Sequence, residues 1–173
     1  ADPSLDVVQV THPDIWQRWL EIETIRKIVP RNSRVIDIGC GAGSVVKSIA
    51  TEMLEVVGLD FSEGMIRRAA DQQTAENVRF VVGDVLNLPA VGLGQFDVAL
   101  SVRCLINLPD WEAQKRALSN IAGVVRPNGL YLFIEGSRDG REALNRLLDL
   151  GDTGIRQLIA LQRGLVGQYL DKK

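Results

Sequence analysis

The chain has 173 residues, of which 46% are hydrophobic and 24% charged, and its formal net charge is −2. The length corresponds to a single domain with a full hydrophobic core, and the composition is that of an ordinary globular protein. A small negative charge without a basic run disfavours a large nucleic-acid surface, and no apolar run approaches the ~20 residues that span a membrane.

A helix is predicted near the N-terminus, over about residues 12–29, and its first part is amphipathic. This part contains Trp16, Arg18 and Trp19. We interpret Trp19 as a residue that packs the helix on the rest of the domain. Two interpretations stand for Trp16 and Arg18: they pack the helix on the domain, or they bind a ligand.

Residues 35–38, with the sequence V-I-D-I, predict a buried strand that leads into Gly39, Gly41 and Gly43. A helical pattern follows the loop. Glycine lets a ligand approach the backbone, and the start of a helix presents free N–H donors. The loop therefore predicts a site for a nucleotide-like cofactor, with the acid Asp37 beside it.

Two further strands are predicted to end in acidic residues. Residues 54–60 end at Asp60, about twenty residues after the glycine loop, where parallel α/β folds reach ribose hydroxyls. Ser62 is a candidate N-cap for the next helix. A third strand, 78–83, is followed by Asp84. Three strand ends of this kind in order favour one binding site over three unrelated turns.

A fourth strand is predicted at residues 96–101 and a fifth at 130–135, with a helix between them that Asp110 can cap. In open parallel sheets the ligand crevice lies at the carboxyl ends of the strands, at the point where the strand order reverses. The order of the strands in the sheet then decides which strand ends face the ligand.

Three motifs resemble those of the class I S-adenosylmethionine-dependent methyltransferases: G-x-G-x-G after the acid at position 37, G-L-D-F-S-E-G-M from residue 58, and R-P-N-G-L from residue 126. The resemblance covers about residues 30–140. It implies a doubly wound, mostly parallel Rossmann-like sheet with helices on both faces, formed by one domain over residues 1–173. It also implies S-adenosyl-L-methionine as cofactor and S-adenosyl-L-homocysteine as product. The cationic sulfonium of this cofactor suits the acid at Asp37.

The same resemblance places the reversal of strand order between the first and fourth strands, so Ser101 to Cys104 would face the transferred methyl group. It also assigns roles to individual residues. Asp84 and the Val85 amide would bind adenine, Phe61 or Met65 would pack on its face, and Arg18 would hold the carboxylate of the methionine end. Arg103 and Asn107 are the catalytic candidates. Two interpretations stand for Arg103: it steers an acidic acceptor, or it is a solvated or ion-paired residue. The cofactor-binding candidates are Asp37, Gly39, Cys40, Gly41, Gly43, Asp60, Phe61, Met65, Asp84, Val85, Ser101 and Arg18.

The C-terminal segment 139–173 departs from the family pattern. Its apolar residues recur at helical spacing, so it predicts helices and the absence of the final antiparallel strand pair. The fifth strand would then be an open edge, which invites a covering helix or a second chain. We expect the last helix to cover that edge or to contribute to a homodimer.

These patterns favour methyl transfer to an amine or hydroxyl of a small molecule. Two alternatives are a cofactor-binding domain without independent activity and, less favoured, an NAD-dependent oxidoreductase. A metal site is not expected, because the chain has one histidine and no cysteine pair at ligand spacing. The two cysteines and the lack of a visible signal peptide favour a reduced, cytoplasmic setting over a Cys40–Cys104 disulfide.

Overall fold

The computed structural model describes residues 15–71, 75–135, 157–162 and 165–170. The helices are α2 (Ile15–Ile28), α3 (Ser44–Ile49), α4 (Glu63–Asp71) and α5 (Trp111–Val124), with the short 3-10 helices η1 (Ala50–Glu52), η2 (Val85–Val91) and η3 (Leu105–Asn107). The strands are β1 (Arg34–Ile38), β2 (Glu55–Asp60), β3 (Val78–Val82), β4 (Phe96–Val102), β5 (Val125–Ile134), β6 (Gln157–Gln162) and β7 (Leu165–Leu170).

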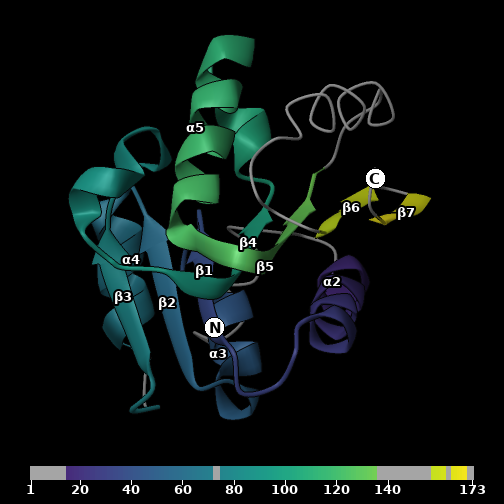
Figure 1. The fold of residues 1–173 in the computed structure, drawn as a ribbon. Helices are drawn as coiled ribbons and strands as arrows, with labels where there is room; N and C mark the ends of the chain where they lie inside the picture. Colours follow the sequence, from purple (N-terminus) through teal and green to yellow (C-terminus); the bar gives the residue numbers. More distant parts are fainter. Residues whose placement is uncertain (1–14, 72–74, 136–156, 163–164, 171–173) are drawn as a thin grey trace.

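The strands form one seven-stranded sheet in the order β3-β2-β1-β4-β5-β6-β7 (Figure 1). All neighbouring strands from β3 to β6 run parallel, and only β7 runs antiparallel to its neighbour. The strand order reverses between β1 and β4, so the ligand crevice of such a sheet lies outside the carboxyl ends of these two strands. The doubly wound, mostly parallel Rossmann-like fold is therefore confirmed.

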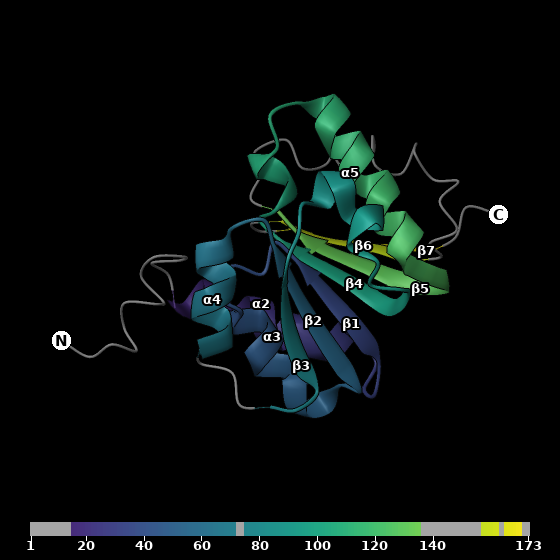
Figure 2. The same cartoon turned by 90° about the vertical axis from the view of Figure 1, so that its left-hand side faces the viewer.

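Helices cover both faces of the sheet, with α5 on one side and α2, α3 and α4 on the other (Figure 2). Alternate residues of each strand point to opposite faces. Accordingly, Ile36 packs in the cluster that contains Ile121 of α5, whereas its neighbour Val35 packs with Ile25 of α2 and Val46 of α3. Burial on both faces explains why these strands are nearly continuous apolar runs without an alternating pattern.

The five strands and the helices predicted between them all form close to their expected positions. Asp110 caps α5 by accepting a hydrogen bond from the Ala113 amide at 2.7 Å, and Ser62 accepts from the Met65 amide at the start of α4 at 3.4 Å. In the part of the chain that the structure describes, no helix is long and apolar enough to cross a membrane.

The prediction of a helical C-terminus without a final strand pair is wrong for residues 157–170. β6 pairs parallel with β5, with Leu158 opposite Tyr131, and β7 pairs antiparallel with β6, with Gly167 opposite Ala160. Short apolar runs fit helix and strand patterns alike, and the unpaired backbone groups of β5 favour a strand beside it. The remainder of the predicted helical segment, 139–156, lies outside the described residues.

The prediction that β5 forms an open edge of the sheet is also wrong, because β6 pairs with β5. The sheet ends at β3 on one side and at β7 on the other. A homodimer that pairs through the edge of β5 is therefore not compatible with this fold.

Candidate active site

The loop between β1 and α3 turns on three glycines with positive φ angles, Gly39 (76°), Gly41 (54°) and Gly43 (76°). L side chains rarely adopt this conformation. A Cβ at Gly39 would lie 2.8 Å from the Sγ of Cys104, so this loop is pressed against the segment that follows β4. A Cβ at Gly43 would lie 2.5 Å from the ring of Phe80, so packing against β3 requires glycine there in addition to the positive φ angle.

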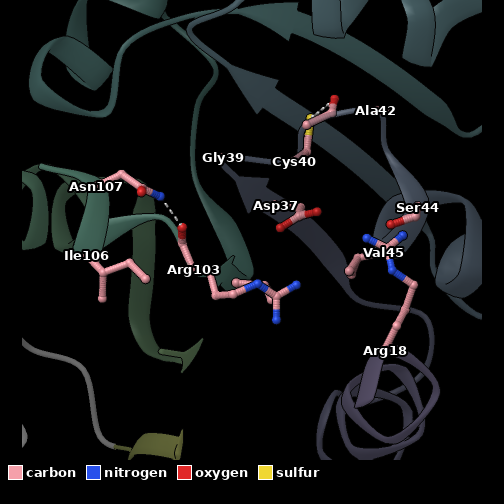
Figure 3. Close-up of a pocket in the computed structure, with 12 residues that line it drawn as sticks. Arg18, Asp37, Gly39, Cys40, Ala42, Ser44, Val45, Arg103, Ile106 and Asn107 are labelled. Carbon is pink, nitrogen blue, oxygen red and sulfur yellow. Dashed lines mark hydrogen bonds between the residues drawn. The ribbon is translucent and has the colours of Figure 1, made fainter. Parts of the chain in front are cut away.

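Two cavities of about 320 and 170 Å³ meet above the carboxyl ends of β1 and β4. They share Gly39, Arg103 and Asn107. The larger cavity extends along the glycine loop toward Arg18 of α2 (Figure 3), and the smaller one extends toward the ends of β2 and β3. The predicted crevice at the reversal of strand order is therefore present, as two neighbouring compartments that share three lining residues.

Asp60, at the end of β2, is buried and held in a fixed orientation. Its Oδ2 accepts a hydrogen bond from the Gly41 amide at 2.8 Å, and its Oδ1 accepts from the Ser62 amide at 2.9 Å. A carboxylate offers about four lone-pair positions, so these two bonds leave acceptor capacity toward the smaller cavity. The hydrogen bond to Gly41 also ties the acid of β2 to the glycine loop.

Asp84, after β3, has two functions in this arrangement. It caps η2, because its Oδ1 accepts a hydrogen bond from the Leu86 amide at 2.8 Å. It also lines the smaller cavity together with Val85. The local turn therefore fixes the carboxyl group without using both of its oxygens.

Asp37, the third residue of the V-I-D-I strand, lines the larger cavity although only 2% of its surface is exposed. Burial, and then the nearby charge of Asp60, raise its pKa from 3.8 to about 7, while Arg18 acts in the opposite direction. A positively charged ligand in this cavity would stabilise the ionised carboxylate and lower this pKa.

Two arginines enter the larger cavity, Arg18 from α2 and Arg103 from the end of β4 (Figure 3). Arg103 forms a salt bridge with Glu21 of α2. Burial, and then the charge of Arg103, lower the pKa of Arg18, while Glu21 and Asp37 raise it. The cavity therefore places two guanidinium groups close to two carboxylates.

The segment after β4 is anchored by Glu135, which directly follows β5. The Glu135 Oε1 accepts a hydrogen bond from the Leu105 amide at 2.9 Å, at the start of η3. Its Oε2 has no hydrogen-bond partner within the described ranges, and burial raises its pKa from 4.5 to about 7. Glu135 thus holds the segment that carries Arg103 and Asn107, although it lines neither cavity.

Most of the predicted site residues line one or both cavities. Three do not. Ser101 is fully buried, and its Oγ lies 2.7 Å from the Tyr131 hydroxyl, so it does not face the crevice as expected. Gly43 and Met65 line neither cavity. The residues that do are Arg18, Asp37, Cys40 and Gly41 in the larger, Asp60, Phe61, Asp84 and Val85 in the smaller, and Gly39, Arg103 and Asn107 in both.

The sequence did not point to Glu21, the partner of Arg103. The one available signal is that Glu21 follows Arg18 by three residues and so lies on the same helix face.

The interpretation of Trp19 as a packing residue is wrong, because 58% of its surface is exposed. Cys40 and Cys104 are free thiols, as expected, and burial raises the pKa of Cys104 to about 12, which argues against a nucleophile.

The sequence of this chain is similar to those of known methyltransferases. A family model described as a methyltransferase domain matches residues 35–129. The O-methyltransferase rstn1 of Aspergillus nomiae is 30% identical over 129 residues, which cover 69% of this chain and 56% of that protein. The chain spans about half the length of the curated relatives it matches.

Solved structures share the fold. A TehB-like SAM-dependent methyltransferase from Corynebacterium glutamicum superimposes with a TM-score of 0.66 at 21% identity, covering 89% of this chain and 79% of that one. A methyltransferase of Haloferax volcanii, solved in complex with the Trm112 methyltransferase activator, gives a TM-score of 0.60 at 18% identity, covering 84% and 76%.

Proposed function

We propose that this chain, which belongs to the class I S-adenosylmethionine-dependent methyltransferases, transfers a methyl group from S-adenosylmethionine to an amine or hydroxyl of a small molecule. The observation that supports this most directly is the junction of the two cavities at Gly39. One compartment offers the acids of β2 and β3, and the other offers a buried carboxyl and an arginine. This pairing fits a ligand with a nucleoside at one end and an amino acid at the other.

The described residues fit such a ligand. Asp60 keeps acceptor capacity for the ribose hydroxyls after bonding Gly41 and Ser62, and Asp84 keeps one oxygen for the exocyclic amine of adenine. Asp37 and Arg18 offer opposite charges for the ammonium and carboxylate groups of the methionine end. A side chain at Gly39 would clash with Cys104 and narrow the junction of the cavities.

The cofactor supplies a methyl carbon that is activated by a positively charged sulfur. The contribution of this chain is to bind and orient the two reactants, and holding them in line can account for much of the rate. Asn107 lines both cavities, and its amide nitrogen donates to the Arg103 carbonyl at 2.6 Å. This bond leaves the Asn107 carbonyl oxygen to accept a hydrogen bond from the hydroxyl or amine of the acceptor.

Calorimetric titration with S-adenosylmethionine, S-adenosylhomocysteine and NAD tests the proposed cofactor. We expect micromolar binding of the first two and at least a tenfold loss of affinity in Asp60→Ala, since charged hydrogen bonds contribute about 1.5–3 kcal/mol each. Asp71→Ala, an exposed acid at the end of α4, is the matched control. Binding of NAD alone would instead support an oxidoreductase.

A second candidate function is that of a cofactor-binding domain that needs a partner for activity. The chain spans only about half of its curated relatives, so the acceptor pocket can require further segments. Binding of S-adenosylhomocysteine together with an absence of methyl transfer to any acceptor would favour this function. We also propose that the chain forms a homodimer through a surface other than the edge of β5, which β6 covers. A solution mass measured by light scattering across a concentration series tests this. The free thiols support a cytoplasmic setting.

A further inference from the structure

We propose that the methyl acceptor is a small molecule that carries a carboxylate, and that Arg103 binds this group. The inference rests on the proposed function and adds the chemical class of the acceptor. It depends on the backbone geometry of Arg103, on the position of its guanidinium, and on the charge of the cavity once the cofactor is present.

The backbone holds Arg103 in a conformation that favours glycine. Its φ angle is 51°, in the left-handed region. Its amide donates to the Ile134 carbonyl at 2.7 Å, and its carbonyl accepts from the Asn107 side chain at 2.6 Å. Non-glycine residues persist in this region where the surrounding structure fixes them, and such positions cluster at ligand-binding sites. The strained turn therefore fixes the direction in which the side chain leaves β4.

The guanidinium of Arg103 keeps N–H donors beyond the one that binds Glu21. Its Nη1 pairs with Glu21, and no other hydrogen bond of the Arg103 side chain is formed within the described segments. A guanidinium has five N–H donors in a planar fork, so the remaining ones can bind a carboxylate through two parallel bonds. The side chain is 24% exposed and lines the larger cavity, which allows a ligand to reach it.

The charges of the larger cavity favour an anionic acceptor. Around this cavity, Arg18 and Arg103 face Asp37 and Glu21. The cofactor would add a sulfonium, an ammonium and one carboxylate, so positive groups would exceed negative groups by one in this compartment. Asp60 and Asp84 add two carboxylates on the smaller cavity, where each accepts a hydrogen bond from at least one backbone amide. A carboxylate on the acceptor therefore complements the larger compartment better than a neutral group does.

Arg18 and Arg103 lie at different places in the site, and we infer a different role for each from its place. Arg18 lines only the larger cavity, beside the glycine loop, and there it can hold the carboxylate of the cofactor. Arg103 lines both cavities and lies at their junction, where the methyl group would be presented. We therefore assign the carboxylate of the acceptor to Arg103.

Nuclear magnetic resonance on protein saturated with S-adenosylhomocysteine tests this assignment with benzoate, benzamide and phenyl phosphate as probes. We expect benzoate to shift the Arg103 Nε signal in a saturable way and to bind at least about tenfold more tightly than benzamide. Arg103→Gln should weaken benzoate binding by a similar factor, and Arg103→Lys by less. Arg31→Gln, which alters an exposed salt bridge with Glu52, is the matched control and should have no effect.

Several results would overturn the inference. These are equal binding of benzoate and benzamide, undiminished benzoate binding in Arg103→Gln, tighter binding of phenyl phosphate than of benzoate, or no probe binding to the loaded protein. A larger loss of S-adenosylhomocysteine affinity in Arg103→Gln than in Arg18→Gln would assign Arg103 to the cofactor instead. Failure of the wild-type protein to bind S-adenosylhomocysteine would refute the proposed function itself, and calorimetry before the probes are added detects that outcome separately.

Discussion

Replacing Asp37 by asparagine should stabilise the ligand-free protein and weaken binding of the cofactor. Burial raises the pKa of this carboxyl from 3.8 to about 7, so the folded state releases its proton less readily than the unfolded chain. Between these two pKa values the folded state holds more protons, and its stability therefore falls as the pH rises. Asparagine has nearly the same shape and cannot ionise.

The magnitude follows from the two pKa values. Above pH 7 the ionised, buried Asp37 costs the folded state about 4 kcal/mol, whereas at pH 5 the cost is about 1.5 kcal/mol because most of the folded protein is protonated there. An amide that fails to find partners would cost about 1–3 kcal/mol at either pH. The informative quantity is therefore the difference: Asp37→Asn should gain about 2.5 kcal/mol more at pH 8 than at pH 5.

Urea unfolding of the ligand-free wild type and of Asp37→Asn at both pH values measures this difference. Asp71→Asn removes the same charge from an exposed position and should change the free energy of unfolding by less than about 0.5 kcal/mol. In parallel, the affinity of the wild type for S-adenosylhomocysteine should rise about tenfold from pH 6 to pH 8, as the carboxylate ionises to meet the ammonium group. An equal effect of the substitution at pH 5 and pH 8, or a pH-independent affinity, would refute a functional buried carboxylate here.

Three further outcomes are expected. Gly39→Ala should destabilise the protein by about 2–4 kcal/mol, because it combines a left-handed backbone with contacts at 2.8 Å to the Sγ and 2.9 Å to the Cβ of Cys104. Adding Cys104→Ala removes the Sγ and keeps the Cβ, so it should recover only the part due to the Sγ contact; urea unfolding of both variants checks this. Glu135→Gln keeps an acceptor for the Leu105 amide but cannot ionise, so it should stabilise the protein more at pH 8 than at pH 5, and an unchanged pH profile would contradict the burial of this charge. Gly43→Ala should destabilise the protein through its contact with Phe80. Gly43 does not line the larger cavity, so the affinity of the folded variant for S-adenosylhomocysteine should stay within about threefold of the wild-type value, which calorimetry can test.

The sequence determined the parts of this protein that depend on neighbours along the chain. The apolar strand 35–38, the glycines that follow it, and the acids at positions 60 and 84 each carry their signal in a few adjacent residues, because strand burial, positive φ angles and caps are local requirements. Parallel strands end at one edge of a sheet, so these local signals also predicted that the residues share one crevice.

Tertiary structure decided what depends on residues distant in the chain. Residues 157–170 fit a helix pattern, and pairing with β5 makes them strands. The same strand order turns Ser101 toward Tyr131, brings Glu21 to Arg103, and sets Phe80 against Gly43. Each of these contacts joins residues on different elements, and its energy depends on burial and charge that arise only when those elements pack. A pattern of neighbouring residues cannot contain that information, and so the partner of Arg103, and with it the charge of the larger cavity, appears only in the folded protein.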